Sequence, residues 1–286
     1  MTNIDQFESV FKSALKDVFS YEPVEIRTVQ VITDLEEGPA KAFADRTRAF
    51  LKVLETDPPP EWEVIFGERF TTVSDLLEVV RGDVSNLICT YRNLHSTAWQ
   101  WPHSLGSHLD VLTQATRCPV LVLPHPKAKG ADNAISGDTH NVMAITDHLA
   151  GDQRLVNMAA AMTFRNGTLF LSHVEDQKTF DRYADIISKL PEVNTDDATA
   201  AIRLQLLKEP HDYIRSCREV LEENQLPLTV EEMVTMGHHL ADYQTLIEQH
   251  DVGLLVMNTK DEDQMAMHGL AYSLAVELRR IPMLLL

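Results

Sequence analysis

The chain has 286 residues, close to twice the length of an average domain of about 150 residues. Its 25 Lys and Arg residues against 43 Asp and Glu residues give a formal charge of −18. This charge excludes a broad phosphate-binding surface and argues against nonspecific nucleic-acid binding. Apolar residues make up 44% and charged residues 24% of the chain, the proportions of a globular protein with a sizeable core.

The cysteines and the N-terminus indicate the compartment. Cys89, Cys118 and Cys217 are odd in number and lie far apart, which fits a reducing environment better than a disulfide framework. The first residues carry acids where a signal peptide needs an apolar core. No window approaches the roughly 18 consecutive apolar residues of a membrane span. We therefore expect a cytoplasmic protein with no membrane insertion.

The first half of the chain alternates helical and strand periodicities. Apolar residues recur every three or four positions in the helical segments, and the strands are short apolar or alternating runs bounded by Pro and Gly. The triplet 58–60 is Pro-Pro-Pro and should end the second helix. Strands that alternate with helices predict a parallel sheet. The expected elements are a helix over 4–18, a strand over 24–33, a helix over 39–54, a strand over 61–66, a helix over 73–80, a strand over 86–91, a helix over 105–115 and a strand over 119–123.

A segment rich in Pro, Gly and small polar residues then interrupts the pattern at 124–140. Such composition is typical of a linker. We therefore divide the chain into a first unit over 1–126, a linker over 127–140 and a second unit over 141–286.

The second half repeats the scheme with one more strand at its front. About fifty residues with helical periods separate the strands that end at 174 and begin at 228, which predicts an enlarged crossover. The expected elements are strands over 141–146, 168–174, 228–235, 252–258 and 282–286, with helices over 152–163, 240–249 and 270–279.

The ends of the two halves can be superposed without gaps. Gly106 and Gly269 each precede by thirteen residues the proline that opens the last strand of their half. The passages from strand to helix also match, because Ile65-Phe66-Gly67 corresponds to Thr235-Met236-Gly237. Agreement across separate elements favours an internal duplication.

These features together resemble the universal stress protein family. The resemblance rests on Met143–Asp147, Leu169–Val174, the glycines at 67 and 237, and the Gly106-Ser107 and Cys118-Pro119 ending. It implies an α/β fold of two tandem doubly wound parallel-sheet domains, each with strand order 3-2-1-4-5. The first repeat lacks a counterpart of the first strand, which is central in that order. Either its neighbours pair directly, another segment fills the slot, or the natural start lies upstream.

ATP-binding members of the family carry the pattern G-x2-G-x9-G-(S/T) after the fourth strand, where glycines let the backbone approach phosphates. The first repeat keeps only Gly106-Ser107 of this pattern, and the second keeps only Gly269. Asp261-Glu262-Asp263 adds three acids to the second loop, and like charges there would repel a triphosphate. We therefore expect that ATP binding is lost and that the protein needs no cofactor.

If a nucleotide such as ATP or AMP were still bound, the resemblance would place it in the second repeat. The residues implied there lie at the ends of its strands or at the start of its last helix: Asp147, Val174, Gly237, Asn258 and Gly269. Asp147 would contact the ribose, or it could simply cap the following helix. Gly106 and Gly269 could line a phosphate site or could permit close helix entry.

No catalytic constellation is present in the sequence. The chain has no Ser-His-Asp series, no Walker-type Gly-Lys-Thr and no His-Glu-x-x-His, so we expect no catalytic residues and no enzyme activity. His95, His103 and His108 lack the spacing of three or four that two ligands on one helical face need, so we expect no metal site.

The expected function is that of a non-enzymatic universal-stress-type protein with a stress-response or regulatory role, acting by association with a protein partner that the sequence does not identify. The alternatives are an adenine-nucleotide sensor or weak ATPase with a diverged site in the second repeat, and an adaptor controlled by a membrane transporter or a kinase. Pairing of the last strands, 119–123 and 282–286, should form an internal pseudo-dimer. Without this pairing, the terminal strand Met283-Leu284-Leu285-Leu286 would be an unpaired apolar edge that is prone to aggregation. A homodimer is a further possibility.

Overall fold

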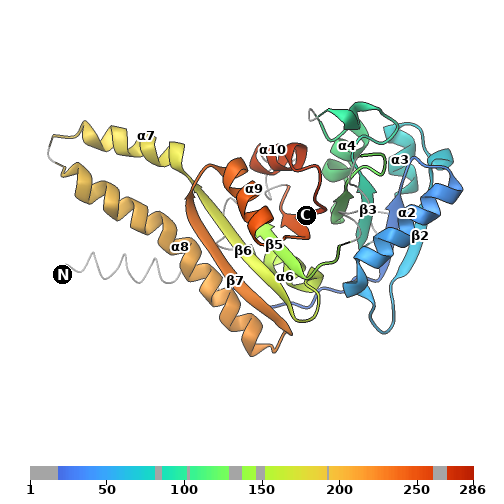
Figure 1. Ribbon diagram of the computed structural model, residues 1–286, viewed down its shortest axis with the longest axis horizontal. Helices are drawn as coiled ribbons and strands as arrows, with labels where there is room; N and C mark the ends of the chain where they lie inside the picture. Colours follow the sequence, from blue (N-terminus) through green and yellow to red (C-terminus); the bar gives the residue numbers. More distant parts are fainter. Residues whose placement is uncertain are drawn as a thin grey trace.

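The computed structural model describes residues 19–80, 86–101, 104–128, 137–145, 152–191, 193–259 and 269–286. The helix expected over 4–18 lies outside the described residues. Within them, the chain forms one mostly parallel nine-stranded sheet in the order β2-β1-β3-β4-β9-β8-β5-β6-β7, with helices packed against it (Figure 1). The expected mixed α/β fold with a parallel sheet is therefore observed.

The first half supplies four parallel strands in the order β2-β1-β3-β4. β1 pairs directly with β3, for example Val29 opposite Leu87, so no strand lies between them. The second helix ends at Phe50 and is followed by a 3-10 turn, so Pro58 does not end it as predicted. The elements are β1 (Thr28–Ile32), α2 (Glu37–Phe50), η1 (Lys52–Leu54), β2 (Glu61–Ile65), η2 (Gly67–Arg69), α3 (Val73–Val79), β3 (Leu87–Tyr91), η3 (Ala98–Gln100), α4 (Ser107–Ala115) and β4 (Val120–Leu123).

The second half supplies five parallel strands in the order β7-β6-β5-β8-β9. The predicted elements are all present, with ends that shift by at most two residues. Its elements are β5 (Asn141–Ile145), α6 (Gln153–Met162), β6 (Gly167–Asp176), α7 (Gln177–Ser188), α8 (Thr195–Glu223), β7 (Leu228–Gly237), α9 (His239–Gln249), β8 (Leu254–Met257), α10 (Gly269–Glu277) and β9 (Met283–Leu285).

The two halves meet at the one antiparallel pair of the described sheet. β4 runs against β9, with Leu121 opposite Leu284, so the terminal strand lies between β4 and β8. The pairing expected between the two last strands is thus observed. The Arg92 side chain also joins the halves, because its Nη1 donates to the carbonyl oxygen of Val276 at 3.2 Å. Burial and the nearby Arg279 lower the pKa of this arginine to about 10.

The enlarged crossover is a hairpin of two helices, α7 and α8, that projects from the body of the molecule (Figure 1). The second part of α8 packs on the sheet through buried Tyr213, Ile214, Cys217 and Leu221. α7 buries only Phe180. The hairpin is therefore anchored at one end and largely uncovered at its tip.

Side chains at the helix starts explain where several helices begin, because they satisfy amide groups that lack partners in the first turn. Thr72 and Asp75 form a capping box at α3. Asp152 accepts from the Leu155 amide at the start of α6. Asp176 and Asn194 cap α7 and α8 in the same way.

Candidate functional site

The structure brings together only some of the residues predicted to contact a nucleotide. Val174, at the carboxyl end of β6, and Gly269, at the start of α10, line the same cavity. Asn258 follows β8 and is not among the residues that line this cavity. Its Nδ2 donates to the carboxylate of Asp152. Asp147 lies outside the described residues.

Gly237 ends β7 and has a packing role. A Cβ atom at this position would collide with the Asp242 carboxylate. That carboxylate accepts from the His238 amide at 2.7 Å in the first turn of α9. The glycine therefore lets Asp242 cap the helix.

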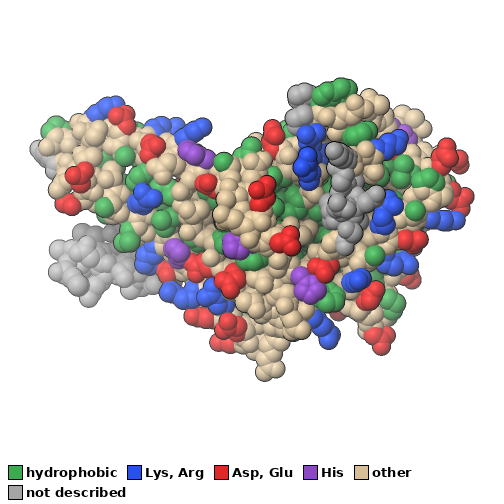
Figure 2. Space-filling view, viewed as in Figure 1, with side chains coloured by type: hydrophobic (Ala, Val, Ile, Leu, Met, Phe, Trp, Pro, Cys, Tyr) green, Lys and Arg blue, Asp and Glu red, His purple; other side chains and the backbone are tan. Residues whose placement is uncertain are grey.

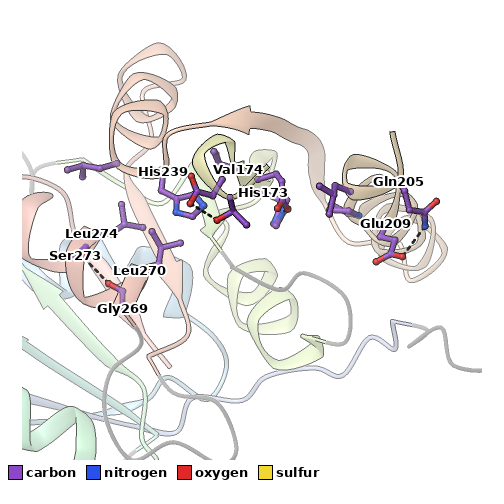
Figure 3. Close-up of a pocket in the computed structure, with 15 residues that line it drawn as sticks. His173, Val174, Gln205, Glu209, His239, Gly269, Leu270, Ser273 and Leu274 are labelled. Carbon is purple, nitrogen blue, oxygen red and sulfur yellow. Dashed lines mark hydrogen bonds and ion pairs between the residues drawn. The ribbon is translucent and has the colours of Figure 1, made fainter. Parts of the chain in front are cut away.

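The cavity has a volume of about 830 Å³ and lies at the carboxyl end of β6, where α7, α8, α9 and α10 converge (Figure 3). Carboxyl ends of parallel strands are the usual position of ligand sites in open α/β sheets. Its lining comprises His173, Val174, Glu175, Asp176, Thr179, Gln205, Leu206, Glu209, Pro210, His239, Leu240, Gly269, Leu270, Ser273 and Leu274.

One side of the cavity is acidic. Asp176 receives hydrogen bonds from the Lys178 amide and the Thr179 hydroxyl, both at 3.0 Å. Although desolvation acts to raise the pKa of Asp176, these bonds and the nearby His239 hold it below its ordinary value. Glu175 contacts the buried His173 ring at 3.2 Å. These carboxylates disfavour an anionic ligand.

The opposite side is apolar and is formed mainly by α10. Leu270 and Leu274 come from successive turns of that helix, and Figure 3 shows them with Gly269 across the cavity from Glu209. Ser273 donates to the carbonyl oxygen of Gly269, so its hydroxyl is engaged within the helix. The cavity can therefore hold a compact organic molecule with an apolar part.

In the first half, the carboxyl ends of β1 and β3 carry a polar cluster. The Tyr91 hydroxyl donates to the Asp34 carboxylate and lies 2.7 Å from the Thr33 hydroxyl. The second oxygen of Asp34 accepts from the His95 amide at 2.7 Å. Both carboxylate oxygens are thus engaged by the chain itself.

Two rings close over this cluster. The His125 ring lies edge-on to Tyr91 at 4.9 Å and stacks on Trp99 at 4.7 Å. Its Nδ1 accepts from the Lys127 amide at 3.1 Å. Burial lowers the pKa of His125 to about 4, against the opposing effect of Asp34, while Lys127 and Arg92 lower it further.

Gly106 has its structural role beside the same cluster. Its φ of +92° is in the region that favours glycine, and a Cβ there would lie 2.7 Å from the Cα of Asn93. The Asn93 amide donates to the Leu105 carbonyl at 2.7 Å. Gly106 therefore permits a close approach of the chain's own backbone, which is the packing interpretation of this glycine.

Sequence reasoning missed Asp34, Tyr91 and His125 as a group. Asp34 follows directly on the strand predicted over 24–33, and His125 follows the strand over 119–123. Side chains directly after parallel strands gather at one edge of the sheet, so this position was an available signal. The glycine pattern of the family resemblance does not include these three positions.

The remaining candidate groups have structural surroundings. The rings of His95 and His108 lie 5.5 Å apart beside Phe70, and His108 Nε2 lies 3.2 Å from the Thr71 carbonyl. In the part of the chain that the structure describes, no three His, Cys, Asp or Glu residues are grouped to hold a metal. The three cysteines are free and buried, and burial raises the pKa of Cys118 and Cys217 to about 12.

No family model and no curated protein matches the sequence. Solved structures do resemble the fold. A protein of unknown function from Pseudomonas aeruginosa PAO1 aligns over 91% of this chain and 92% of its own, with 13% identity and a TM-score of 0.47. A putative universal stress protein from Pseudomonas aeruginosa UCBPP-PA14 aligns over 91% and 93%, with 12% identity and a TM-score of 0.47. A universal stress protein from Archaeoglobus fulgidus DSM 4304 aligns over 91% and 85%, with 11% identity and a TM-score of 0.45.

Among the described helices, none combines the length and the apolar character needed to cross a membrane.

Proposed function

We propose that the chain is a tandem universal-stress-type protein of the cytoplasm that acts by association with proteins and has lost adenine-nucleotide binding. The observation that carries this proposal is the closed cluster of the first half. Asp34 is bound by Tyr91 and His95, and the backbone of Asn93 lies against Gly106, where ATP-binding members of the family would admit phosphate.

The strand order supports the tandem interpretation. Numbered from β5, the order β7-β6-β5-β8-β9 reads 3-2-1-4-5. The order β2-β1-β3-β4 is the same series without its first strand. The antiparallel pairing of β4 with β9 is what an approximate two-fold axis between the two series would produce, and it supports an internal pseudo-dimer. We therefore retain 1–126 and 141–286 as the two units, joined by the linker 127–140.

The chemistry of the cavity in the second half supports the loss of ATP binding. Glu175, Asp176 and Glu209 contribute three carboxylates to its lining, whereas the lining among the described residues contains no Lys or Arg. A triphosphate entering this space would meet like charge without a compensating cation.

A specific observation also favours the alternative, an adenine-nucleotide sensor. The cavity is large enough for a nucleotide, and Val174 and Gly269 both line it. A Cβ added at Gly269 would meet no atom within 4 Å, so the space in front of this glycine is open.

Nucleotide titration decides between the two. We expect the melting temperature to stay unchanged with ATP, ADP, AMP or cyclic AMP at millimolar concentration, and we expect no phosphate release from ATP. A ligand at about 100 times its Kd would stabilise the fold by about 2.7 kcal/mol, and such a shift would overturn the proposal. If a shift appears, its loss in Gly269→Val but not in Gly106→Val would assign it to the second half.

A further inference from the structure

The charges around the cavity at the carboxyl end of β6 differ from those on the nearby surface. Glu175 and Asp176 come from the end of β6, and Glu209 comes from α8. The lining contains two histidines but, among the described residues, no Lys or Arg. On the hairpin of α7 and α8, by contrast, acidic and basic side chains are interspersed on the face that Figure 2 shows. The permanently charged groups of the described lining are therefore all negative.

The chain does not neutralise these three carboxylates with its own cations. Among the described residues, no Lys or Arg lies within ion-pair distance of any of them. Glu209 accepts from the Gln205 side chain at 3.1 Å, and Asp176 accepts from a backbone amide and a hydroxyl group. Glu175 contacts the His173 ring. Neutral hydrogen bonds leave the negative charge in place, so a bound cation would find charge complementarity here.

The positions of the carboxylates favour an organic cation over a metal ion. A divalent metal needs several ligands that converge on one point. In the part of the chain that the structure describes, no three His, Cys, Asp or Glu side chains are grouped in that way. An ammonium group is less demanding, because its three donors rotate and a single carboxylate can pair with it.

The wall formed by α10 supplies an apolar surface next to these charges. Leu270 and Leu274 lie one turn apart on α10, and both line the cavity. Figure 3 shows them with Gly269 on one side of the cavity and Glu209 on the other. Leu240, from the start of α9, adds to the apolar lining. A ligand that fills this space therefore gains from removing its own apolar part from water.

We propose that this cavity binds a small organic cation in which an ammonium group carries an apolar chain or ring. The ammonium group pairs with the carboxylates of Glu175, Asp176 and Glu209, and the apolar part packs against Leu270 and Leu274. The inference goes beyond the proposed function, which assigns no ligand to the cavity. The two can fail separately, because ammonium compounds and nucleotides are titrated as different ligands.

Isothermal titration calorimetry of the full chain tests the proposal with probes of matched shape. The probes are phenethylammonium, the neutral phenethyl alcohol and the anionic hydrocinnamate, and hexylammonium replaces the ring by a chain. We expect saturable binding of the ammonium probes with a Kd of about 1 mM or below. The alcohol and the anion should bind at least about tenfold more weakly, because neither compensates the carboxylates. Mg²⁺ at the concentration of the probe should not displace phenethylammonium.

A pair of double variants assigns the binding to the cavity. Glu175→Gln combined with Glu209→Gln keeps the side-chain shapes and removes two charges, and should weaken binding of phenethylammonium by about fivefold or more. Glu219→Gln combined with Glu222→Gln is the matched control. Both control positions are exposed on α8 and lie outside the cavity lining. This control changes the total charge equally and should alter the affinity by less than about twofold. Circular dichroism and the melting temperature establish that each variant is folded.

Several outcomes would overturn the inference. Equal affinity for phenethylammonium and phenethyl alcohol would show that the carboxylates do not select the ligand. Equal weakening in both double variants would assign the binding to the overall charge of −18, and displacement by Mg²⁺ would indicate a metal site. Absence of saturable binding of both ammonium probes would also overturn it. Nucleotide titration of the wild type reports on the proposed function independently of these results.

Discussion

The Tyr91 hydroxyl donates a hydrogen bond to the Asp34 carboxylate and so joins the carboxyl ends of β3 and β1. The Asp34 amide in turn donates to the same hydroxyl at 3.2 Å. Burial, followed by the hydrogen bond to Asp34, raises the pKa of Tyr91, so the phenol keeps the proton that it donates. The carboxyl ends of β1 and β3, the edge at which open α/β sheets usually bind ligands, are thus joined by hydrogen bonds within the chain.

Removing this hydroxyl should destabilise the protein without opening a large cavity. We expect Tyr91→Phe to lower the free energy of unfolding by about 1–3 kcal/mol, because Asp34 and Thr33 each lose a buried partner. Tyr183→Phe removes an exposed hydroxyl and should change it by less than about 0.5 kcal/mol. Urea unfolding of both variants measures the difference. Equal effects would mean that the hydrogen bonds of the Tyr91 hydroxyl contribute nothing to stability.

The two repeat glycines should respond in opposite ways to alanine. Gly106→Ala meets both a positive φ and the Cα of Asn93, and should cost about 2 kcal/mol or more. Gly269→Ala has open space and should be neutral or stabilising by up to about 1 kcal/mol. Denaturant unfolding of both variants makes the comparison. Similar losses at the two sites would contradict the assignment of Gly106 to packing.

Much of the fold could be predicted from the sequence because its elements carry strong local signals. Buried parallel strands such as Leu254–Met257 are uninterrupted apolar runs, and Pro119 and Pro282 mark where the last strands begin. The direct pairing of β1 with β3 could not be chosen in advance. It depends on which strands meet in space, and the residues of both strands are apolar enough to suit any central position.

The site was predicted less completely, for a physical reason. Val174 and Gly269, which both line the cavity, were predicted from local features, namely a strand end and a glycine at a helix start. Glu209 and Leu206 enter the cavity from α8, about thirty residues beyond the strand end. Their role depends on how far the α7–α8 hairpin folds back, and no local pattern reports that.

Acid should destabilise the first half through His125. Its folded-state pKa of about 4 lies below the ordinary value of 6.5, so the neutral ring is favoured in the folded protein. This contribution is fully present above about pH 6.5 and is lost as the pH falls toward 4. Between pH 7 and pH 5 we expect about 2 kcal/mol of stability to be lost through this residue alone.

The variant His125→Phe isolates that contribution from other titrating groups. It keeps a ring beside Trp99 and should reduce the fall in stability between pH 7 and pH 5 by about 2 kcal/mol. His238→Phe, at an exposed position, is the matched control and should retain the full pH dependence of the wild type. Parallel slopes for wild type and His125→Phe would exclude His125 as the acid-sensitive group.

The terminal strand should be as important to stability as any central strand, because it lies between β4 and β8. Leu284 is 1% exposed, and it faces Leu121 on one side and Val256 on the other. Leu284→Ala should therefore lower the free energy of unfolding by about 2–5 kcal/mol, whereas Leu77→Ala should lower it by less than about 0.5 kcal/mol.

Deleting residues 282–286 should yield aggregated protein, because β4 and β8 would each present an unpaired edge. A monodisperse, cooperatively unfolding truncation, measured by light scattering and urea unfolding, would show that the two halves do not depend on this strand.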